Sequence, residues 1–337
     1  MTQTTTSDVI LPAGYTARPV DPDPDARAIY ELCAEAAVAE YGTPDVTPRL
    51  VRESWNTPGF VPERDTRVVL DIASQPAALV EYYENGPAYV APFMYVRVRP
   101  HLLGAGLVES LVAWAEQRSR EAVRLAAPEL RVALHASVAA ANPETIAILE
   151  RAGWALERVY WTMEIDLGDA PPEPAGLPDG ILIRTAEAGR DEPAVHRLEA
   201  ESFSGHYEYL PIPYEEWLQA RTQLHPYDPS LWFLAVDGDR LVGMSLCLPE
   251  ASGRPEVGWV ATLGVHPEWR GRGLGLALLR HSFGELHRRG RHTVGLGVDS
   301  QNTTGATRLY ERAGMHVTRE SRSFERLLRD GRELRAT

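Results

Sequence analysis

The stretch Val265–Gly275, VHPEWRGRGLG, lies between an apolar run that is typical of a strand and the helical pattern LALLRHSFGELH. Glycine occupies every second position from 271 to 275, which leaves backbone N–H groups uncovered and permits left-handed backbone angles. At a helix N-terminus, such N–H groups and the helix dipole favour an anion such as pyrophosphate. Arg270 and Arg272 add positive charge that could face phosphate. The stretch therefore predicts a strand, a phosphate-binding loop and a helix in succession.

Three kinds of phosphate-binding loop compete for this pattern. A P-loop requires lysine, and the chain contains none, since all 34 basic residues are arginine. A dinucleotide-binding loop requires glycine or alanine three residues after its second glycine, where this chain has Leu276 or Leu278. The third kind is the acetyl-coenzyme A loop, with the pattern Arg/Gln-x-x-Gly-x-Gly/Ala. Arg270, Gly273 and Gly275 match that pattern in order.

The second half of the chain resembles the GNAT acyltransferases from about residue 181 to 328, because a second family signature follows this loop. It consists of Asn302, the helical pattern GATRLYERAG and Tyr310, four residues before Gly314. The resemblance implies that Tyr310 protonates the departing thiolate and that Asn302 holds the pantetheine arm or orders the loop. It also implies that the strand before the loop binds pantetheine and polarises the thioester carbonyl through its backbone. The implied contacts with acetyl-CoA are Leu263, Gly264, Val265, Arg270, Gly271, Arg272, Gly273, Leu274, Gly275 and Asn302.

The general base is less clearly marked. Relatives often carry a carboxylate three or four residues before the position of Val265, where this chain has Thr262 and Ala261. Glu256 is the nearest carboxylate on this strand, and His206 has the intrinsic pKa of a base that works at neutral pH. A water relay would remove the need for a direct base.

The segment Ser202–Trp217 follows the first helix of the second half, where the family places its acceptor-binding loop. Four of its side chains could recognise an ammonium group: Glu208, Tyr209, Tyr214 and Glu215. For each of them, a solvated loop charge or a packed aromatic ring is the alternative interpretation. The contacts with the acceptor therefore stay open at this point.

An internal repeat indicates that a whole domain has been duplicated. The sequence ERAG occurs at 150–153 and again at 311–314, and each copy follows a Gly-x-Gly loop and an apolar helix. The proline-rich segment 168–180, GDAPPEPAGLPDG, separates the halves and cannot continue a helix or a central strand. The predicted organisation is an N-terminal domain at 1–168, a linker at 169–179 and a C-terminal domain at 180–337.

Each half mixes helices and strands in the same order. Early amphipathic helices are expected at Asp25–Glu40 and Asp191–Phe203. Strands are expected at Arg67–Ile72, Arg131–Ala136, Leu231–Val236 and Thr293–Asp299. This order predicts an α+β fold class. With the resemblance, it implies two tandem GNAT folds, each a mixed central sheet flanked by helices.

The first half departs from the pattern of the second. Its loop, at Pro100–Gly104, is two residues shorter than Pro267–Gly273, so the arginine position is missing or taken by His101. Leu149 stands where Tyr310 stands in the second half, which leaves no evident acid for the thiolate. We therefore expect a supporting, non-catalytic first domain, while its remaining Gly-x-Gly leaves residual cofactor binding open.

Composition limits the partners. Of the 337 residues, 44% are hydrophobic, which is enough for two packed cores. A net charge of −13 disfavours nucleic acid and suits cationic partners. Cys33 and Cys247 are expected as reduced thiols, and no spacing of cysteine and histidine suggests a metal. No signal peptide or apolar run of membrane-spanning length is evident, so we expect a cytoplasmic protein without membrane contact.

The resemblance implies an acetyl-CoA-dependent N-acetyltransferase that acts directly on a primary amine. A small-molecule acceptor is favoured, such as an antibiotic, another secondary metabolite or a mycothiol-precursor-like compound. Two alternatives remain: acetylation of protein N-termini or side chains, and a non-catalytic acyl-CoA sensor. The protein is expected to be a monomer or a homodimer.

Overall fold

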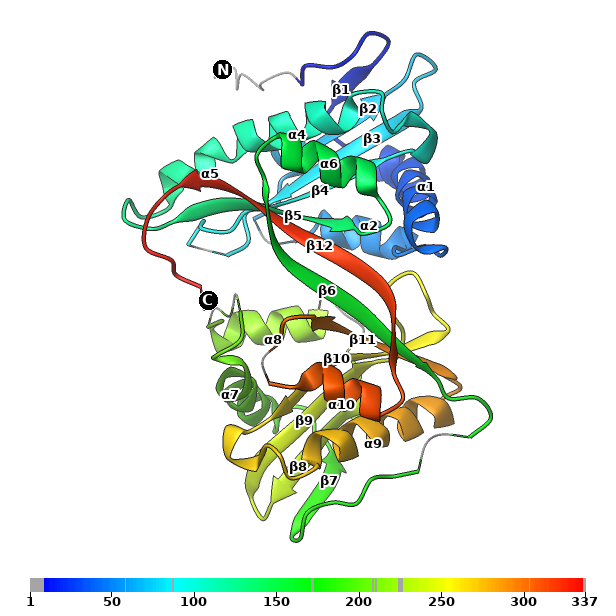
Figure 1. The fold of residues 1–337 in the computed structure, drawn as a ribbon, viewed down its shortest axis with the longest axis vertical. Helices are drawn as coiled ribbons and strands as arrows, with labels where there is room; N and C mark the ends of the chain where they lie inside the picture. Colours follow the sequence, from blue (N-terminus) through cyan, green and yellow to red (C-terminus); the bar gives the residue numbers. More distant parts are fainter. Residues whose placement is uncertain are drawn as a thin grey trace. The chain divides into compact units, whose positions relative to one another are not determined.

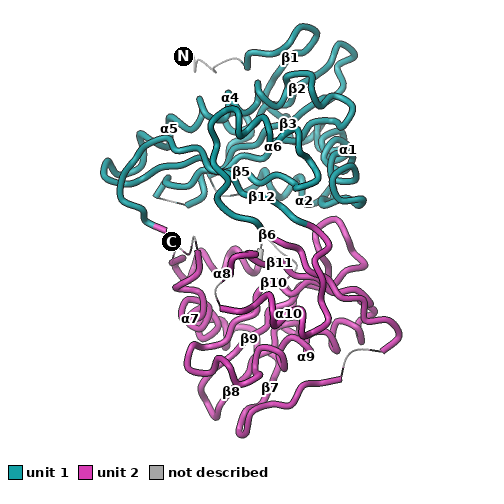
Figure 2. Tube along the Cα trace, in the orientation of Figure 1, with its two compact units in different colours: residues 1–159, 320–334 teal, residues 160–319, 335–337 magenta. Residues whose placement is uncertain are grey.

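The computed structural model describes residues 9–57, 59–86, 88–170, 173–207, 209, 211–223, 227–302 and 304–335. The chain divides into two units, shown in different colours in Figure 2. Unit 1 comprises Met1–Val159 and Glu320–Leu334, and unit 2 comprises Tyr160–Arg319 and Arg335–Thr337. None of the helices in the described ranges has the length and apolar character needed to cross a membrane.

Unit 1 is built on a mixed sheet with the strand order β1-β2-β3-β4-β5-β12 (Figure 1). Strands β4 and β5 are parallel, and the other neighbouring strands are antiparallel. The strands are β1 (Thr16–Arg18), β2 (Thr66–Leu70), β3 (Pro76–Tyr83), β4 (Phe93–Val98), β5 (Val132–Ala139) and β12 (His316–Arg329). The helices are α1 (Pro22–Tyr41), α2 (Pro48–Ser54), α3 (Pro62–Asp65), η1 (Pro100–Leu102), α4 (Leu107–Arg118), α5 (Arg120–Leu125) and α6 (Pro143–Arg151).

Unit 2 repeats this plan with the strand order β6-β11-β10-β9-β8-β7. Here β10 and β11 are the parallel pair. The strands are β6 (Ala155–Asp166), β7 (Ile181–Thr185), β8 (Trp232–Asp237), β9 (Arg240–Leu248), β10 (Val257–Val265) and β11 (Thr293–Asp299). The helices are α7 (Glu192–Phe203), α8 (Tyr214–Gln223), η2 (Pro229–Leu231), η3 (Pro267–Trp269), α9 (Leu274–Arg288) and α10 (Ala306–Arg312). The predicted α+β class with two GNAT-like mixed sheets is confirmed.

Each half of the sequence gives its last strand to the other half's unit. Residues Tyr160–Asp166 of β6 pair with β11 in unit 2, although they precede the proline-rich linker. Residues Ser321–Arg329 of β12 pair with β5 in unit 1. The units therefore do not follow the predicted boundaries 1–168 and 180–337. The physical reason is that alternation along a strand shows which faces are buried but not which sheet the strand joins.

Each unit has its own apolar core. In unit 1, Phe324 of β12 is completely buried in one cluster with Leu134 of β5 and Leu111 of α4. In unit 2, Leu278 of α9 is buried with Val294 of β11. The helix pattern LALLRHSFGELH, singled out in the sequence, therefore packs α9 onto the sheet, as its helical periodicity predicts.

The same ion pair fixes the start of both units. The guanidinium of Arg18 donates to both oxygens of Asp25 at 2.6 and 2.7 Å, next to the start of α1. Arg184 donates to both oxygens of Asp191 at 2.5 and 2.8 Å, next to the start of α7. Seven residues separate the partners in each pair, so the duplication extends to the first strand and helix of each unit.

Candidate active site

The parallel strands of unit 2 separate where the family would place its thioester. Strands β10 and β11, both described in full, pair only from Val257 to Trp259. Strand β10 continues to Val265 with β9 alone as its partner, and a bulge lies between Val260 and Thr262. The end of β10 therefore has backbone groups that face an opening instead of a neighbouring strand.

The glycine loop leads from this opening into α9. Gly271 and Gly273 have φ values of +75° and +83°, which side-chain-bearing residues adopt only with strain. Gly273 is the N-cap residue of α9, and none of the described side chains caps the helix end. The first N–H groups of α9 are therefore available to an anion, as the sequence predicts.

Gly275 has a packing role. A Cβ there would lie 2.9 Å from Cδ1 of Leu309, so the absence of a side chain lets α9 approach α10. The closeness of these helices brings the Tyr310 helix to the N-terminal turn of α9.

The two arginines of the loop contact protein groups. Arg270 donates from Nη2 to the carbonyl of Ser202 at 2.7 Å and from Nε to the carbonyl of Val265 at 3.3 Å. Arg272 lies over the ring of Trp269, with its guanidinium carbon 4.7 Å from the ring centroid. Arg270 thus joins the glycine loop to the end of α7. The sequence analysis expected its charge to face a phosphate, whereas here it donates to protein carbonyls.

Tyr310 of α10 is buried in the core of unit 2, with 8% of its surface exposed. Burial raises the pKa of its phenol to about 12, so the hydroxyl keeps its proton at neutral pH. A retained proton is what a general acid requires. Asn302 accepts a hydrogen bond at 2.8 Å from the backbone N–H of Thr304, which orders the turn after β11.

His206 lies just after α7, and its ring stands edge-on to Phe203 at a centroid distance of 4.7 Å. Burial lowers its pKa below the ordinary value, and the charge of Arg270 lowers it further, while Asp299 opposes the shift. The imidazole is therefore neutral at pH 7, the form that accepts a proton.

The remaining candidates for the acceptor site are scattered. Tyr214 stacks on Trp217 at 6.1 Å and packs against the core next to α7. Glu215 is exposed in the first turn of α8, and Tyr209 is partly buried with a pKa raised by that burial. Glu208 lies outside the described residues.

Glu256 stands at the other end of β10 from the loop. It is exposed, and its Oε1 lies 3.3 Å from Nε of Arg254. Nine residues separate it from Val265, which is roughly 25–30 Å along a strand. The structure therefore does not bring Glu256 to the opening. Arg270 contacts the end of β10 and the end of α7, His206 packs on Phe203 just after α7, and Tyr310 lies in the core beside α9.

Sequence reasoning missed one buried carboxylate of unit 2. Glu164 of β6 is 7% exposed and accepts a hydrogen bond at 2.5 Å from Nη1 of Arg254. Since Glu164 precedes the linker, it was expected in the first domain. Only the pairing of β6 with β11 places it in unit 2.

Unit 1 keeps the opening but not the acid. Strands β4 and β5 pair only at Phe93 and Met94, and a cavity of about 210 Å³ follows, lined in part by Arg97, Asn142 and Leu149. Leu149 is buried at the place where unit 2 has Tyr310. This cavity therefore offers space without a phenol.

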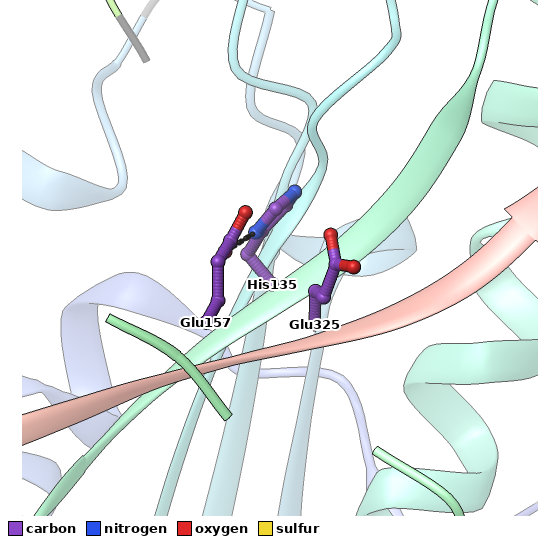
Figure 3. A group of neighbouring side chains, drawn as sticks. All are labelled: His135, Glu157 and Glu325. Atoms are coloured by element: carbon purple, nitrogen blue, oxygen red, sulfur yellow. Dashed lines mark hydrogen bonds and ion pairs between the residues drawn. The ribbon is translucent and has the colours of Figure 1, made fainter. Parts of the chain in front are cut away.

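A histidine and two glutamates meet elsewhere in unit 1. Figure 3 shows Glu157 pointing toward His135 of β5, with Glu325 nearby. Their nearest ligand atoms all lie within 4.8 Å of one another, and these are donor types that bind divalent metals. Glu325 also accepts a hydrogen bond from Arg131 at 2.6 Å. The group is an ion-pair cluster within unit 1, and no metal is assigned to it.

The sheet, the separated parallel strands and the glycine loop before α9 define the acyl-CoA acyltransferase class of fold. A model of the acetyltransferase (GNAT) family matches residues 193–315. A GCN5-related N-acetyltransferase from Sphaerobacter thermophilus has a similar structure, with a TM-score of 0.84, 34% identity and coverage of 97% of this chain and 100% of that one. The tandem GNAT protein from the clavulanic acid biosynthesis pathway shares the fold at a TM-score of 0.71 and 16% identity, covering 94% and 100% of the two chains.

Curated relatives point the same way. A mycothiol acetyltransferase from Geodermatophilus obscurus is 37% identical over 189 residues, which are 55% of this chain and 59% of that protein. A second, from Thermobispora bispora, is 36% identical over 220 residues, which are 64% of this chain and 70% of that protein. The chain thus spans less than two thirds of the first relative's length. The chain belongs to the GNAT acetyltransferase family.

Proposed function

We propose that unit 2 is an N-acetyltransferase that uses acetyl-CoA to acetylate a primary amine of a small molecule by direct transfer. The observation that carries the proposal is the left-handed glycine loop at the uncapped start of α9, beside separated parallel strands and a buried phenol. The N–H groups of this loop and helix end suit a pyrophosphate. The unpaired backbone at the end of β10 suits an amide-rich arm such as pantetheine.

The residues divide the chemistry between them. Acetyl-CoA supplies an activated acetyl group, whose C–S bond breaks as a C–N bond forms. His206 accepts the proton that the attacking nitrogen loses, and Tyr310 donates its hydroxyl proton to the leaving sulfur. Backbone N–H groups near Val265 stabilise the negative charge on the carbonyl oxygen. Proton return from His206 to Tyr310 through water restores both groups.

The acceptor is proposed as a cationic small molecule. The net charge of −13 favours the approach of an ammonium compound. The relatives named mycothiol acetyltransferase make a mycothiol-precursor-like amine one of the first compounds to assay. Unit 1, with Leu149 in place of a phenol, is proposed as a supporting unit.

Charge reversal at the loop tests the acetyl-CoA site. We expect Arg270→Glu to weaken acetyl-CoA binding at least tenfold, because it puts a negative charge beside the uncapped start of α9 and removes the bonds to Ser202 and Val265. The measurement is calorimetric titration, which also gives the stoichiometry. Arg288→Glu makes the same charge change in the last turn of α9 and should leave the affinity within about twofold.

The stoichiometry separates the possible outcomes. One site, lost in Arg270→Glu alone, supports a functional unit 2 and a supporting unit 1. A second site that survives the substitution would assign acetyl-CoA binding to unit 1 as well. Absence of binding in the wild type would overturn the proposal. Binding without release of free thiol, for any amine in a library, would favour the sensor alternative.

The base assignment predicts a pH dependence. Since the pKa of His206 is lowered, the fall of kcat on acidification should begin at a lower pH than for an ordinary imidazole and reach tenfold per unit below the lowered pKa. His206→Gln should lower kcat about a hundredfold and abolish this acid limb. His316→Gln, an exposed histidine at the start of β12, is the control. An unchanged acid limb in His206→Gln would exclude His206 as the base.

A further inference from the structure

Arg270 of the glycine loop joins the ends of two elements of unit 2. Its Nη2 donates to the carbonyl of Ser202, in the last turn of α7, at 2.7 Å. Its Nε donates to the carbonyl of Val265, the last residue of β10, at 3.3 Å. Carbonyls in the last turn of a helix have no partner within the helix, and a cation is favourable at that end. Arg270 therefore caps α7 from the cofactor loop.

Unit 1 has a different residue at this position. There the turn η1 is followed by Leu103 and then by the left-handed Gly104. In unit 2 the turn η3 is followed by Arg270 and then by the left-handed Gly271. Leu103 therefore stands at the position of Arg270, where the sequence suggested His101 or a gap. A leucine cannot cap a carbonyl.

The helix that Arg270 caps is shorter than its counterpart in unit 1. Asp25 and Asp191 are equivalent, since each accepts hydrogen bonds from an arginine and from the backbone N–H four residues before it. Helix α7 ends at Phe203, 12 residues after Asp191, whereas α1 ends at Tyr41, 16 residues after Asp25. The capped helix thus stops about one turn earlier. The chain then turns into the segment that carries His206.

The end of α7 holds His206. The backbone N–H of His206 donates to the carbonyl of Phe203 at 2.8 Å, and its ring stands edge-on to the ring of Phe203. Phe203 and Ser202 lie against β10, because a Cβ on Gly264 would be 3.3 Å from Cε2 of Phe203 and 3.3 Å from Oγ of Ser202. The position of His206 relative to β10 therefore depends on how firmly the end of α7 is held.

We propose that Arg270 is a positioning residue that couples the two substrate sites, and this inference rests on the proposed function of unit 2. Acetyl-CoA orders the glycine loop. Arg270 transmits that order to the last turn of α7 through the carbonyl of Ser202, and α7 in turn holds His206 for the incoming amine. Such a coupling is reciprocal, so an ordered α7 end also favours acetyl-CoA. The base is held most firmly when acetyl-CoA is bound, which favours binding of the cofactor before the amine.

Arg270→Leu tests the contact in the free protein, since it gives unit 2 the residue that unit 1 has. Amide hydrogen exchange at Ser204 and His206 should become at least about tenfold faster, because a charge-assisted hydrogen bond is lost from the end of α7. The N–H groups of both residues bond to carbonyls in the last turn of α7, so their exchange reports on that turn.

Arg272→Leu is the matched control. It removes the same charge from the loop, where Arg272 lies over the ring of Trp269, and none of the contacts of the described residues joins Arg272 to α7. Exchange at Ser204 and His206 should stay within about twofold of the wild type. Protection of α9 should be unchanged in both variants, which shows that unit 2 is folded.

Acetyl-CoA tests the coupling itself. At a concentration that calorimetry shows to be saturating, acetyl-CoA should slow exchange at Ser204 and His206 by at least about fivefold in the wild type and in Arg272→Leu. In saturated Arg270→Leu, the cofactor should still protect the amides of the glycine loop. The two amides at the end of α7 should not respond.

The NMR signals of the histidine ring give a readout that a general loss of stability would not produce. The ring current of Phe203 should shift the ring protons of His206 in the wild type. In Arg270→Leu these protons should move toward the shifts of His316, which is exposed at the start of β12. Arg272→Leu should keep the wild-type shifts.

Three results would each overturn the positioning role. They are unchanged exchange at Ser204 and His206 in Arg270→Leu, the same change in Arg272→Leu, and faster exchange in the wild type when acetyl-CoA binds. The last would mean that Arg270 leaves Ser202 for a phosphate. Absence of acetyl-CoA binding would overturn the proposed function and the coupling with it. If acetyl-CoA binds and an amine is acetylated without a response at His206, the proposed function stands and the coupling alone fails.

Discussion

Tyr310→Phe should lower kcat by about 10²- to 10⁴-fold at saturating acetyl-CoA and amine, the range that a general acid supplies. The phenol of Tyr310, with its pKa of about 12, keeps its proton through neutral pH and can give it to a departing thiolate. The substitution removes one oxygen from a buried, apolar position, so the fold and the affinity for acetyl-CoA should be kept. The measurement is thiol release under saturating conditions.

A second tyrosine provides the matched control. Tyr227 of unit 2 donates its hydroxyl proton to Glu192 at 2.8 Å, away from the glycine loop. Tyr227→Phe should keep kcat within about twofold, with a stability loss of roughly 1 kcal/mol. Undiminished turnover in Tyr310→Phe would exclude the phenol as the acid and leave water to protonate the thiolate.

Phe324→Ala should destabilise unit 1 by about 3–5 kcal/mol, the usual cost of removing a fully buried phenyl group. Phe324 lies in the C-terminal half of the sequence, yet its ring fills the core of unit 1. Hydrogen exchange should therefore show lost protection in β5 and α4, while α9 of unit 2 stays protected. Urea unfolding gives the magnitude.

Leu327→Ala is the control on the same strand. Leu327 is half exposed and pairs with Ala133 of β5. Leu327→Ala should lower the free energy of unfolding of unit 1 by about 0.5 kcal/mol or less, as for most surface substitutions. Protection lost in α9 instead of α4 would contradict the assignment of β12 to unit 1.

The sequence was informative wherever function depends on local geometry. Glycines after a strand and before a helix need left-handed angles, so the loop around Gly271 and Gly273 could be predicted from spacing alone. The same holds for the helix of Tyr310 and for the short loop of unit 1. The seven-residue spacing of Arg18 and Asp25, repeated at Arg184 and Asp191, was also readable but was overlooked.

Contacts between distant residues could not be predicted. The hydrogen bond from Arg270 to the carbonyl of Ser202 depends on where α7 ends relative to the glycine loop. No local sequence pattern shows this. The position of Glu164 depends on which sheet β6 joins. The alternation of buried and exposed residues along β6 would be the same in either sheet, so the sequence does not show which one it is. For the general base, the family's spacing falls on Thr262 and Ala261, so the sequence left Glu256 and His206 as candidates, and only the fold shows that Glu256 lies at the far end of β10 from the loop.

The placement of β12 in unit 1 has a consequence for synthesis on the ribosome. About 160 residues must be translated between Val159 and Glu320, which takes roughly 8–30 s at 5–20 residues per second. During that time β5 has an unpaired edge and the site of Phe324 is vacant. The nascent N-terminal segment therefore exposes a strand edge and an incomplete core until β12 has been synthesised. A run of slowly translated codons before β12 would lengthen the time during which β5 is unpaired. Tags or truncations near β12 would destabilise unit 1 before unit 2.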